Sequence, residues 1–581
     1  MKNLLKIIAI VFLSQTVTAQ EDKHIKMSEY IGVNSNVAAY DQHYLTDLAK
    51  CTKWIREYHS WAHYEAANES YKWDNITKEP QGYTWPDHNK FMDQCQQLGI
   101  TVLIDVLGKP GWAGSDRGAY NTGDGSQPED YLERLEFVGQ LVARYGAQKV
   151  DKALLETADK VSGLNYIKYY EDDNEPDYWW EDPLWPAEKY AIYCNAVHDG
   201  YGVETSEDYP LLGIKSVDST AVHVLAGLAK TDPVYLQKIL NTSNGRVPFD
   251  VLNIHTYCTD KTNGYSPENE KFGMEKEMGG FMDWCERNLS GIPVWLTEFG
   301  WDTYIDNGQH SYVYAPHEQQ ANYILRSYFI TLEMGFKKAF LFMDKDPNSA
   351  GTLQYSSSGV ITDKDHGHMK KPSYYYLATM QKILGESVYD STQSYGELFA
   401  DKALYNFKFT TENNETIYVL WTRKINSNND SGAKLPYKLE LGYRPESVFS
   451  ILPQDNDMDG DTLVHETQGT QIDLTVTETP QFVVVSGAST SSVQPVEKEF
   501  DFNVYPNPAE NQVNISLFSN KESRMKVEIH TLEGKLMKVL ADRIFQSGNN
   551  YLTFGEKLKQ GMYLVSVNSA NYRKVEKVFV R

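Results

Sequence analysis

Two glutamates follow predicted strands in aromatic surroundings. Glu175 comes just after the β-rich run at 166–170, and Glu298 lies near the end of the apolar run at 293–299. A buried strand that ends in carboxylates contributes little to a core, but it suits a sugar site at the mouth of a barrel. Hydrolysis of a glycosidic bond needs one protonated carboxyl group at the leaving oxygen and one ionised carboxylate across the ring. Together the two glutamates predict such a pair, although either alone is more often a solvated loop charge.

The neighbours of the two glutamates predict different roles for them. Glu175 lies among carboxylates and the tryptophans Trp179 and Trp180. Apolar surroundings and nearby negative charge favour the protonated form of a carboxyl group, as a general acid/base requires. Glu298 has fewer acidic neighbours and is the predicted nucleophile. His255 is either a core histidine or a partner that orients Glu298 from the end of a predicted strand.

Other polar and aromatic residues also fall near predicted strand ends. Arg56 could form a structural ion pair, or it could hold a carboxylate nucleophile ionised. Asp105 could line a subsite or belong to a loop. The predicted substrate-binding residues are Arg56, Asn174, His255, Tyr257, Trp112, Trp179, Trp301 and Asp344.

Eight apolar runs alternate with helical patterns over the first two thirds of the chain. Near-continuous apolar strands are typical of parallel sheets that are buried on both faces. The pattern predicts a (β/α)8 TIM barrel with loop insertions. An open doubly wound sheet is the alternative, but no glycine-rich phosphate loop follows the first strand. The predicted strands are 31–34, 54–61, 101–112, 166–170, 211–217, 249–257, 293–299 and 337–346.

The pattern changes after residue 385 to short alternating strands with Asn, Asp and Gly turns, as in a β-sandwich. The first residues combine lysines, a short apolar core and a Val-Thr-Ala cleavage site, which predicts a signal peptide too short to anchor the chain in a membrane. The predicted organisation is a signal peptide at 1–19, a barrel at 27–382, a β-sandwich at 385–488, a linker at 489–500 and a small all-β domain at 501–581.

Charge and cysteine content exclude several classes. The net charge of −24 argues against nucleic acid and mildly against a heavily sulfated polysaccharide, because both need a basic track. Aromatic residues make up 13% of the chain, which fits either stacking on sugar rings or β-rich packing. The five cysteines are sparse and odd in number, so one pair could form, but most are predicted to be buried and free.

The two glutamate motifs resemble the signatures of clan A retaining glycoside hydrolases. The motifs are Asn174-Glu175-Pro176 and Thr297-Glu298-Phe299-Gly300, and Arg56 and the pair His255 and Tyr257 match the usual sugar-site positions of the clan. The resemblance covers roughly 28–380 and implies a (β/α)8 fold, a β-linkage and a glycosyl-enzyme intermediate. Strand eight departs from the clan, because Phe342-Met343-Asp344 stands where many members have a tryptophan, and this leaves the sugar open.

The last segment is similar to the type A sorting domains of the Bacteroidetes type IX secretion system. The similarity rests on Tyr505-Pro506-Asn507-Pro508, 532–535, the turn at 561–563 and the basic-apolar ending at 574–581. It implies the type IX secretion machinery as a partner, and a secreted or cell-surface location.

Four acidic residues in the predicted sandwich have the spacing of a calcium loop: Asp455, Asp457, Asp459 and Glu466. An EF-hand needs flanking helices, whereas the flanks here are predicted strands. A solvated β-hairpin turn is the favoured interpretation, and no metal site is predicted.

These observations predict a secreted, monomeric, cofactor-free retaining glycosidase that cuts a polysaccharide, with internal cleavage favoured by the aromatic residues near strand ends. A carbohydrate-binding surface protein without activity is the alternative, although a binder has no need of a carboxylate pair. No H-E-x-x-H or G-x-S-x-G motif occurs, so metalloprotease and α/β-hydrolase interpretations lack their residues.

Overall fold

The computed structural model describes most of the chain between residues 25 and 580, in two compact units, 1–487 and 488–581. The predicted signal peptide, Trp179 and most of the predicted linker lie outside the described residues. The residues that are not described are 1–24, 36–41, 74–76, 79–82, 85–87, 115–121, 179–184, 304–312, 391–396, 400, 414, 426–429, 468, 489–499, 508, 510–511, 532–534, 555–557, 570–572 and 581.

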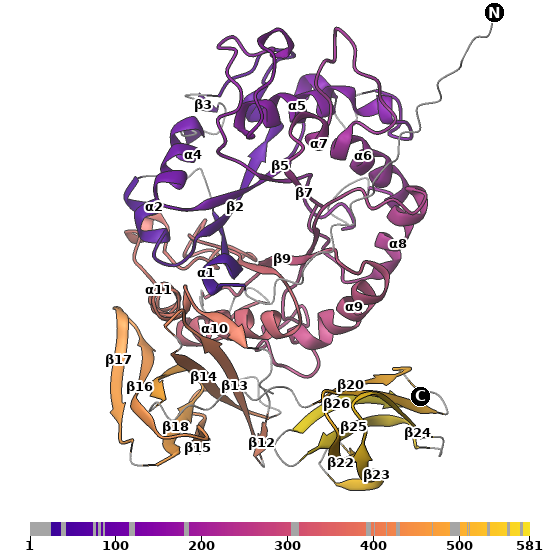
Figure 1. Ribbon diagram of the computed structural model, residues 1–581. Helices are drawn as coiled ribbons and strands as arrows, with labels where there is room; N and C mark the ends of the chain where they lie inside the picture. The colour runs from indigo at the N-terminus through magenta and orange to yellow at the C-terminus, as the bar shows by residue number, and fades with distance from the viewer. Residues whose placement is uncertain are drawn as a thin grey trace, which may run out of the picture. The chain divides into compact units, whose positions relative to one another are not determined.

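Eight parallel strands form a barrel in the first unit (Figure 1). They pair in the order β7-β6-β5-β2-β1-β10-β9-β8, and a parallel bridge between Val224 and Val251 joins the two ends. This arrangement confirms the predicted (β/α)8 fold. The strands are β1 Ile31–Ser35, β2 Trp54–Ser60, β5 Thr101–Leu107, β6 Tyr169–Glu171, β7 Val222–Val224, β8 Leu252–His255, β9 Val294–Phe299 and β10 Lys338–Leu341.

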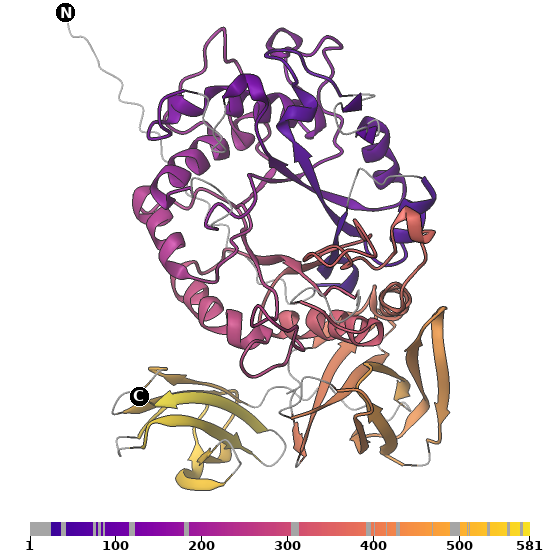
Figure 2. The ribbon, with the colours of Figure 1, turned by 180° about the vertical axis from the view of Figure 1, so that it is seen from behind.

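Helices surround the strands, as the view from behind shows (Figure 2). They fit the helical patterns that alternate with the apolar runs, because amphipathic periodicity over ten or more residues is a strong signal. The helices are α1 Met27–Tyr30, α2 Gln42–Leu48, α3 Trp61–Tyr64, α4 His88–Gln97, α5 Leu132–Tyr145, α6 Ala187–Asp199, α7 Ile214–Val217, α8 Pro233–Thr242, α9 Met274–Asn288, α10 His317–Glu333 and α11 Pro372–Leu384. The short hairpin β3 Thr77–Lys78 and β4 Tyr83–Thr84 lies between α3 and α4 in the chain.

Large apolar side chains form one layer inside the barrel. Trp54, Trp295 and Phe340 are buried together in one cluster, and the Trp54 and Trp295 rings are 5.8 Å apart. The layer leaves no room beside Phe340, because a Cβ on Gly32 would lie 2.3 Å from its ring. Side chains two residues apart point to the same face of a strand, so Arg56 follows Trp54 inside the barrel, one layer nearer the carboxyl ends.

The predicted fifth strand at 211–217 is wrong. Residues Ile214–Val217 form the helix α7, and the fifth strand is Val222–Val224. Gly213 has a positive φ of 80°, which ends the extended backbone before the helix. Ile214 and Val217 are buried and three residues apart, a spacing that fits a helix that packs on a neighbour better than a strand.

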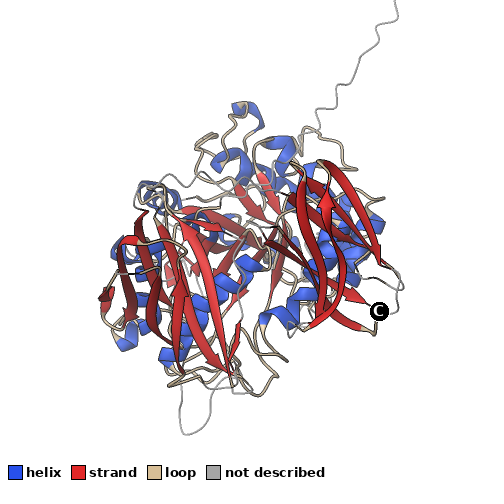
Figure 3. Cartoon of the chain, turned by 60° about the horizontal axis from the view of Figure 1, so that its bottom comes forward, coloured by secondary structure: helices blue, strands red, loops and turns tan. Residues whose placement is uncertain are grey.

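An antiparallel β-sandwich follows the barrel in the same unit (Figure 3). One sheet runs β11-β13-β14-β19-β16-β17, with β12 on β13, and the second pairs β15 with β18. The side chains between the sheets include Leu404, Leu439, Leu474 and Val483. The strands are β11 Val388–Asp390, β12 Glu397–Phe399, β13 Lys402–Thr410, β14 Thr416–Lys424, β15 Lys434–Glu440, β16 Pro445–Gln454, β17 Asp457–His465, β18 Gln471–Thr477 and β19 Gln481–Ala488.

The second unit is all β and has its own core. Its sheets are β20-β21-β24 and β23-β22-β25-β26, around Phe502, Ile515, Val527 and Val565. This agrees with the small all-β domain that the sequence predicts at the end of the chain. The strands are β20 Phe500–Tyr505, β21 Val513–Ser519, β22 Ser523–Thr531, β23 Leu536–Phe545, β24 Gly548–Phe554, β25 Gly561–Asn568 and β26 Arg573–Val580.

All five cysteines are buried and free, so no disulfide joins them. Within the described part of the chain, no helix has the length and apolar character needed to cross a membrane.

A buried arginine ties the barrel to the sandwich. Arg326 on α10 is fully buried, and its Nη1 lies 2.8 Å from Asp430 Oδ2 and 3.6 Å from Glu268 Oε2. Its Nε donates to the Glu478 carbonyl at 3.0 Å. Residues from two separate regions of the chain therefore depend on one cation.

We expect Arg326→Met to lower the free energy of unfolding by about 3–5 kcal/mol, because two carboxylates would stay buried without a cation. Chemical denaturation followed by tryptophan fluorescence measures the loss. The control is Lys438→Met, which breaks an exposed ion pair with Asp473 and should change little. Equal effects of the two substitutions would contradict the structural role of Arg326.

Candidate active site

Arg56 on β2 is fully buried and pairs with three carboxylates at the carboxyl ends of the strands. Its Nη2 lies 2.8 Å from Asp105 Oδ2, its Nε 2.6 Å from Glu171 Oε2, and its Nη1 2.8 Å from Glu298 Oε1. Nη2 also donates to Asn174 Oδ1 at 2.9 Å. A buried guanidinium needs several acceptors, and its planar fork can bind them in fixed directions. Arg56 therefore forms structural ion pairs and also contacts one of the two predicted catalytic glutamates.

Glu171 at the end of β6 is a site residue that the sequence analysis did not single out. Besides Arg56, it accepts hydrogen bonds from Gly227 N at 3.1 Å and from Asn253 Nδ2 at 2.8 Å. Burial raises the pKa of Glu171, but its two oxygens face only N–H donors in these contacts, which is the pattern of a carboxylate. The signal was available, because Tyr169 and Glu171 share one face of the strand.

Glu298 on β9 is surrounded by hydrogen-bond donors. Arg56 Nη1 and the Tyr58 hydroxyl donate to Oε1, and the Tyr257 hydroxyl donates to Oε2 at 2.8 Å. Burial acts to raise the pKa of Glu298, but the positive charge of Arg56 and the hydrogen bonds from the two tyrosine hydroxyls act against it, and the pKa lies below its usual value of 4.5. The site therefore favours the ionised form of Glu298.

Glu175 is held close to Glu298 by its backbone and by one histidine. Its φ of 51° turns the chain sharply after β6, and its N–H donates to the Gly227 carbonyl at 3.0 Å. Its side chain is 4% exposed, and Oε1 lies 2.6 Å from His255 Nδ1. One oxygen of Glu175, one oxygen of Glu298 and one nitrogen of His255 all lie within 4.8 Å of one another. The structure thus brings the two predicted catalytic glutamates together.

His255 at the end of β8 lies between the two glutamates and is neutral. Its Nδ1 is 2.6 Å from Glu175 and 3.7 Å from Glu298 Oε2. Burial lowers the pKa of His255 to about 3, although Glu298 acts in the opposite direction. Gly227 packs directly on the imidazole, since a Cβ there would lie 2.0 Å from Nε2. The ring therefore has one position in the site.

Two polar side chains lie behind His255. Thr297 Oγ1 is 3.0 Å from His255 Nε2, and it donates to Asn253 Oδ1 at 2.7 Å. All three side chains are buried on the adjacent strands β8 and β9. A chain of hydrogen bonds thus connects Glu175 through His255, Thr297 and Asn253 to Glu171.

Aromatic rings flank the ionised glutamate. The Tyr257 and Tyr355 rings are 4.9 Å apart, the Phe342 and Tyr355 rings 5.2 Å, and the Tyr58 and Phe342 rings 6.5 Å. Phe342, which stands where many clan A enzymes have a tryptophan, thus belongs to an aromatic group next to Glu298. Tyr58 and Tyr355 are not among the predicted site residues, because only the fold brings them there.

Three predicted substrate-binding residues are not among these contacts. Trp112 is half-buried and donates from its indole N–H to the Glu65 carbonyl at 2.9 Å. Trp301 is 1% exposed, and its indole N–H donates to the Tyr265 carbonyl at 2.9 Å. Asp344 is buried, and its own N–H donates to the Asn34 carbonyl at 2.9 Å. Trp301 is therefore a core residue of the barrel wall, and Trp179 lies outside the described residues.

The acidic loop of the sandwich is a hairpin, as the favoured interpretation predicted. Strands β16 and β17 are antiparallel, and Asp455 lies in the turn between them. Asp457 and Asp459 belong to β17, Asp459 forms an ion pair with Lys382, and Glu466 follows the strand. The residues with the calcium-loop spacing thus run from a hairpin turn along a strand.

A second cluster of possible metal ligands lies outside the site. Donor atoms of Asp172, Cys194 and His223 are within 4.8 Å of one another. Asp172 Oδ1 accepts from the Tyr190 hydroxyl at 2.8 Å, and the Cys194 thiol donates to the Pro248 carbonyl at 3.2 Å. The first contact joins the end of β6 to α6, and the second joins α6 to the segment before β8.

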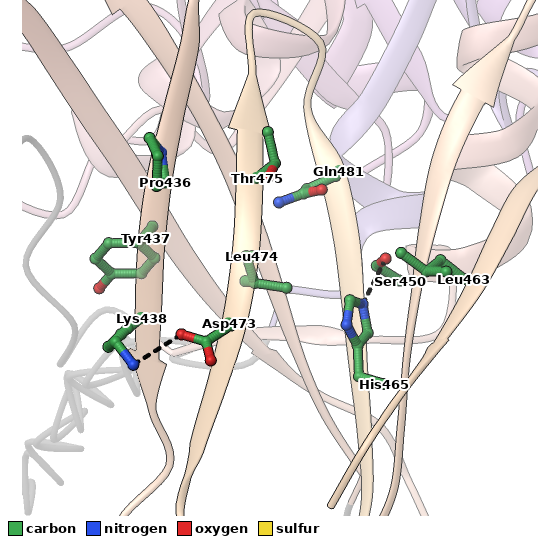
Figure 4. Close-up of a pocket in the computed structure, with 10 residues that line it drawn as sticks. All are labelled: Pro436, Tyr437, Lys438, Ser450, Leu463, His465, Asp473, Leu474, Thr475 and Gln481. Carbon is green, nitrogen blue, oxygen red and sulfur yellow. Dashed lines mark hydrogen bonds and ion pairs between the residues drawn. The ribbon is translucent and has the colours of Figure 1, made fainter.

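An open pocket of about 670 Å³ lies on the sandwich, lined by residues of both of its sheets (Figure 4). Its polar contacts are the Lys438–Asp473 ion pair at 2.9 Å and the hydrogen bond between His465 and Ser450 at 2.8 Å. None of its lining residues belongs to the carboxylate cluster. The cluster in the barrel is therefore the candidate active site.

Comparison with known proteins assigns the last segment. Residues 503–581 match the family described as a secretion system C-terminal sorting domain. This match confirms the predicted type IX sorting domain, which directs the protein to the cell surface or out of the cell. No curated protein matches the chain in sequence.

Solved structures resemble the chain in fold at low sequence identity. A family 39 glycoside hydrolase from Bacteroides cellulosilyticus is 17% identical with a TM-score of 0.53, over 79% of this chain and 82% of its own. An alpha-L-arabinofuranosidase from Thermotoga maritima is 13% identical with a TM-score of 0.52, over 79% of this chain and 97% of its own. A thermostable alpha-L-arabinofuranosidase from Thermotoga petrophila is 13% identical with a TM-score of 0.50, over 80% of this chain and 98% of its own. The barrel with its trailing β-strands is thus a fold found in glycoside hydrolases.

We expect Arg56→Met to lower the free energy of unfolding by about 3–5 kcal/mol at pH 7, because three carboxylates would lose their buried cation. Arg56 acts to lower the pKa of all three carboxyl groups, so without it their folded-state pKa values rise. Protonation at lower pH then offsets part of the loss. Urea denaturation should therefore show a smaller difference in the free energy of unfolding between Arg56→Met and the wild type at pH 5 than at pH 7. The exposed Arg444→Met is the control. A deficit that does not change with pH would contradict this account of the cluster.

Proposed function

We propose that the protein is a retaining glycoside hydrolase that cleaves β-glycosidic bonds of a polysaccharide. The observation that carries the proposal is the pair Glu175 and Glu298, which have oxygens within 4.8 Å of each other and of His255. Retaining enzymes have carboxyl groups about 5–5.5 Å apart, whereas inverting enzymes leave about 6.5–9.5 Å for a water molecule. The spacing supports the retaining mechanism.

Glu298 is the nucleophile in this proposal. Its carboxylate attacks the anomeric carbon and forms a covalent glycosyl-enzyme intermediate. Three donors hold its oxygens in place: Arg56, Tyr58 and Tyr257. They also keep the pKa of Glu298 low against the effect of burial, so that the nucleophile is ionised before substrate binds.

Glu175 is the general acid and then the general base. It gives a proton to the leaving oxygen as the glycosidic bond breaks, and it takes a proton from water as the intermediate is hydrolysed. The sharp turn at Glu175 and its hydrogen bond to Gly227 hold the side chain opposite Glu298.

The proposal also covers the type of linkage and whether the polysaccharide is cleaved internally or from an end. The β-linkage follows from the resemblance of the two glutamate motifs to clan A enzymes. Aromatic residues near strand ends favoured internal cleavage, but Trp301, one of them, is buried. We retain internal cleavage as the proposal for an exported enzyme, and product length decides it.

We expect the mature protein to release reducing sugar from one of a panel of polysaccharides that includes β-1,3-glucan, mannan, xylan and galactan. Glu298→Gln should reduce release to background, and Glu175→Gln should reduce it about 10²–10⁴-fold. The exposed Glu275→Gln is the matched control and should keep full activity. Early products of several sugar units indicate internal cleavage, and single sugars indicate cleavage from an end.

Undiminished release by Glu298→Gln would place the active site elsewhere. Glycan binding in calorimetry without any product from the wild type would favour the alternative, a carbohydrate-binding surface protein.

The pH profile tests the environment of Glu298. Its pKa is held below 4.5, so kcat/KM should fall on the acid side only below that pH. Tyr257→Phe removes one hydrogen bond to the carboxylate, and the acid limb should then move to higher pH by about one unit or more. Tyr551→Phe, at an exposed tyrosine, is the control. An acid limb that is identical in both variants would exclude this role of Tyr257.

A further inference from the structure

A chain of hydrogen bonds leads from Glu171 through Asn253, Thr297 and His255 to Glu175. Glu171 determines which group donates and which accepts at each step. Glu171 accepts from Arg56 through two N–H groups, from Gly227 N and from Asn253 Nδ2. Because a carboxylate only accepts, the amide nitrogen of Asn253 must face Glu171, and its oxygen must face Thr297. The opposite orientation would place the amide oxygen 2.8 Å from a carboxylate oxygen.

Thr297 transmits this direction to the histidine. A hydroxyl has one proton, and the Thr297 hydroxyl donates it to Asn253 Oδ1 at 2.7 Å. Towards His255 Nε2, at 3.0 Å, the hydroxyl can therefore only accept. This requires the proton of the neutral imidazole to be on Nε2, which leaves a lone pair on Nδ1.

The lone pair on Nδ1 faces Glu175 Oε1 at 2.6 Å. An ionised Glu175 would place two acceptors against each other at this distance, whereas a protonated carboxyl group donates to Nδ1. The buried site has no bulk water to relieve the first arrangement, since Glu175 is 4% and His255 is 1% exposed.

We propose that Asn253 and Thr297 are positioning residues that fix the Nε2–H tautomer of His255 and thereby keep the proton on Glu175. The inference rests on the proposed function, because it explains how the general acid is protonated before the first step. The proton leaves with the departing alcohol when the glycosidic oxygen takes it. A proton from the attacking water restores it when the glycosyl-enzyme ester is hydrolysed, so the cycle is balanced.

The isosteric substitution Thr297→Val tests the chain, and Thr297→Ser is the matched control that keeps the hydroxyl. Without the hydroxyl, His255 can carry its proton on Nδ1 and donate it to an ionised Glu175, which makes loss of the Glu175 proton easier. On the polysaccharide that the wild type cleaves, the basic limb of the kcat/KM profile should move to lower pH by about one unit in Thr297→Val, a tenfold loss above that limb. Thr297→Ser should follow the wild type.

A uniform loss of activity in Thr297→Val with the limb unchanged would overturn the inference, because a purely structural role predicts that result. The pH of the basic limb distinguishes the two explanations, since a packing defect lowers kcat/KM at every pH.

A spectroscopic measurement does not depend on activity or on the variant. In protein labelled with ¹⁵N-histidine, the His255 signals at pH 7 are identified by their loss in His255→Gln. We expect a protonated Nε2 and an unprotonated Nδ1 in the wild type, whereas a protonated Nδ1 would overturn the inference. If the wild type cleaves no glycan, the proposed function fails, and the tautomer is still decided.

Discussion

The structure depends on how the charge of Arg56 is accommodated inside the barrel. An apolar layer that includes Trp54, Trp295 and Phe340 lies on one side of the guanidinium, so its partners must come from the carboxyl ends of the strands. Asp105, Glu171 and Glu298 supply them from three different strands. A buried cation that lost one of these partners would be strongly unfavourable, and this requirement aligns the strand ends with one another.

The same cation separates the two glutamates chemically. Glu298 receives a charged donor and two hydroxyls, which hold its pKa low, whereas the contact of Glu175 at 2.6 Å is with a neutral histidine. Two carboxyl groups of the same type thus have different environments a few ångströms apart. Pairs of titratable groups with such different environments are a feature of acid–base sites.

Two further domains follow the barrel in the chain, the β-sandwich and the sorting domain. Arg326 joins α10 to the sandwich through Asp430 and Glu478. A buried ion pair therefore connects the sandwich to the barrel, in addition to their apolar contacts. The sorting domain is a separate compact unit with its own apolar core.

The sequence by itself determined the fold class and the sorting domain, and it singled out two glutamates that meet in the barrel, because strand periodicity and short motifs are local signals. It did not determine the fifth strand, since apolar residues at 211–217 fit both a strand and a helix that packs on a neighbour. It also failed for Trp301, because strand-end position does not reveal which side of the wall a ring enters. Only the tertiary structure placed Asn253 and Tyr355 in the site. Their roles arise from contacts between strands and loops far apart in the chain, and no local pattern encodes such contacts.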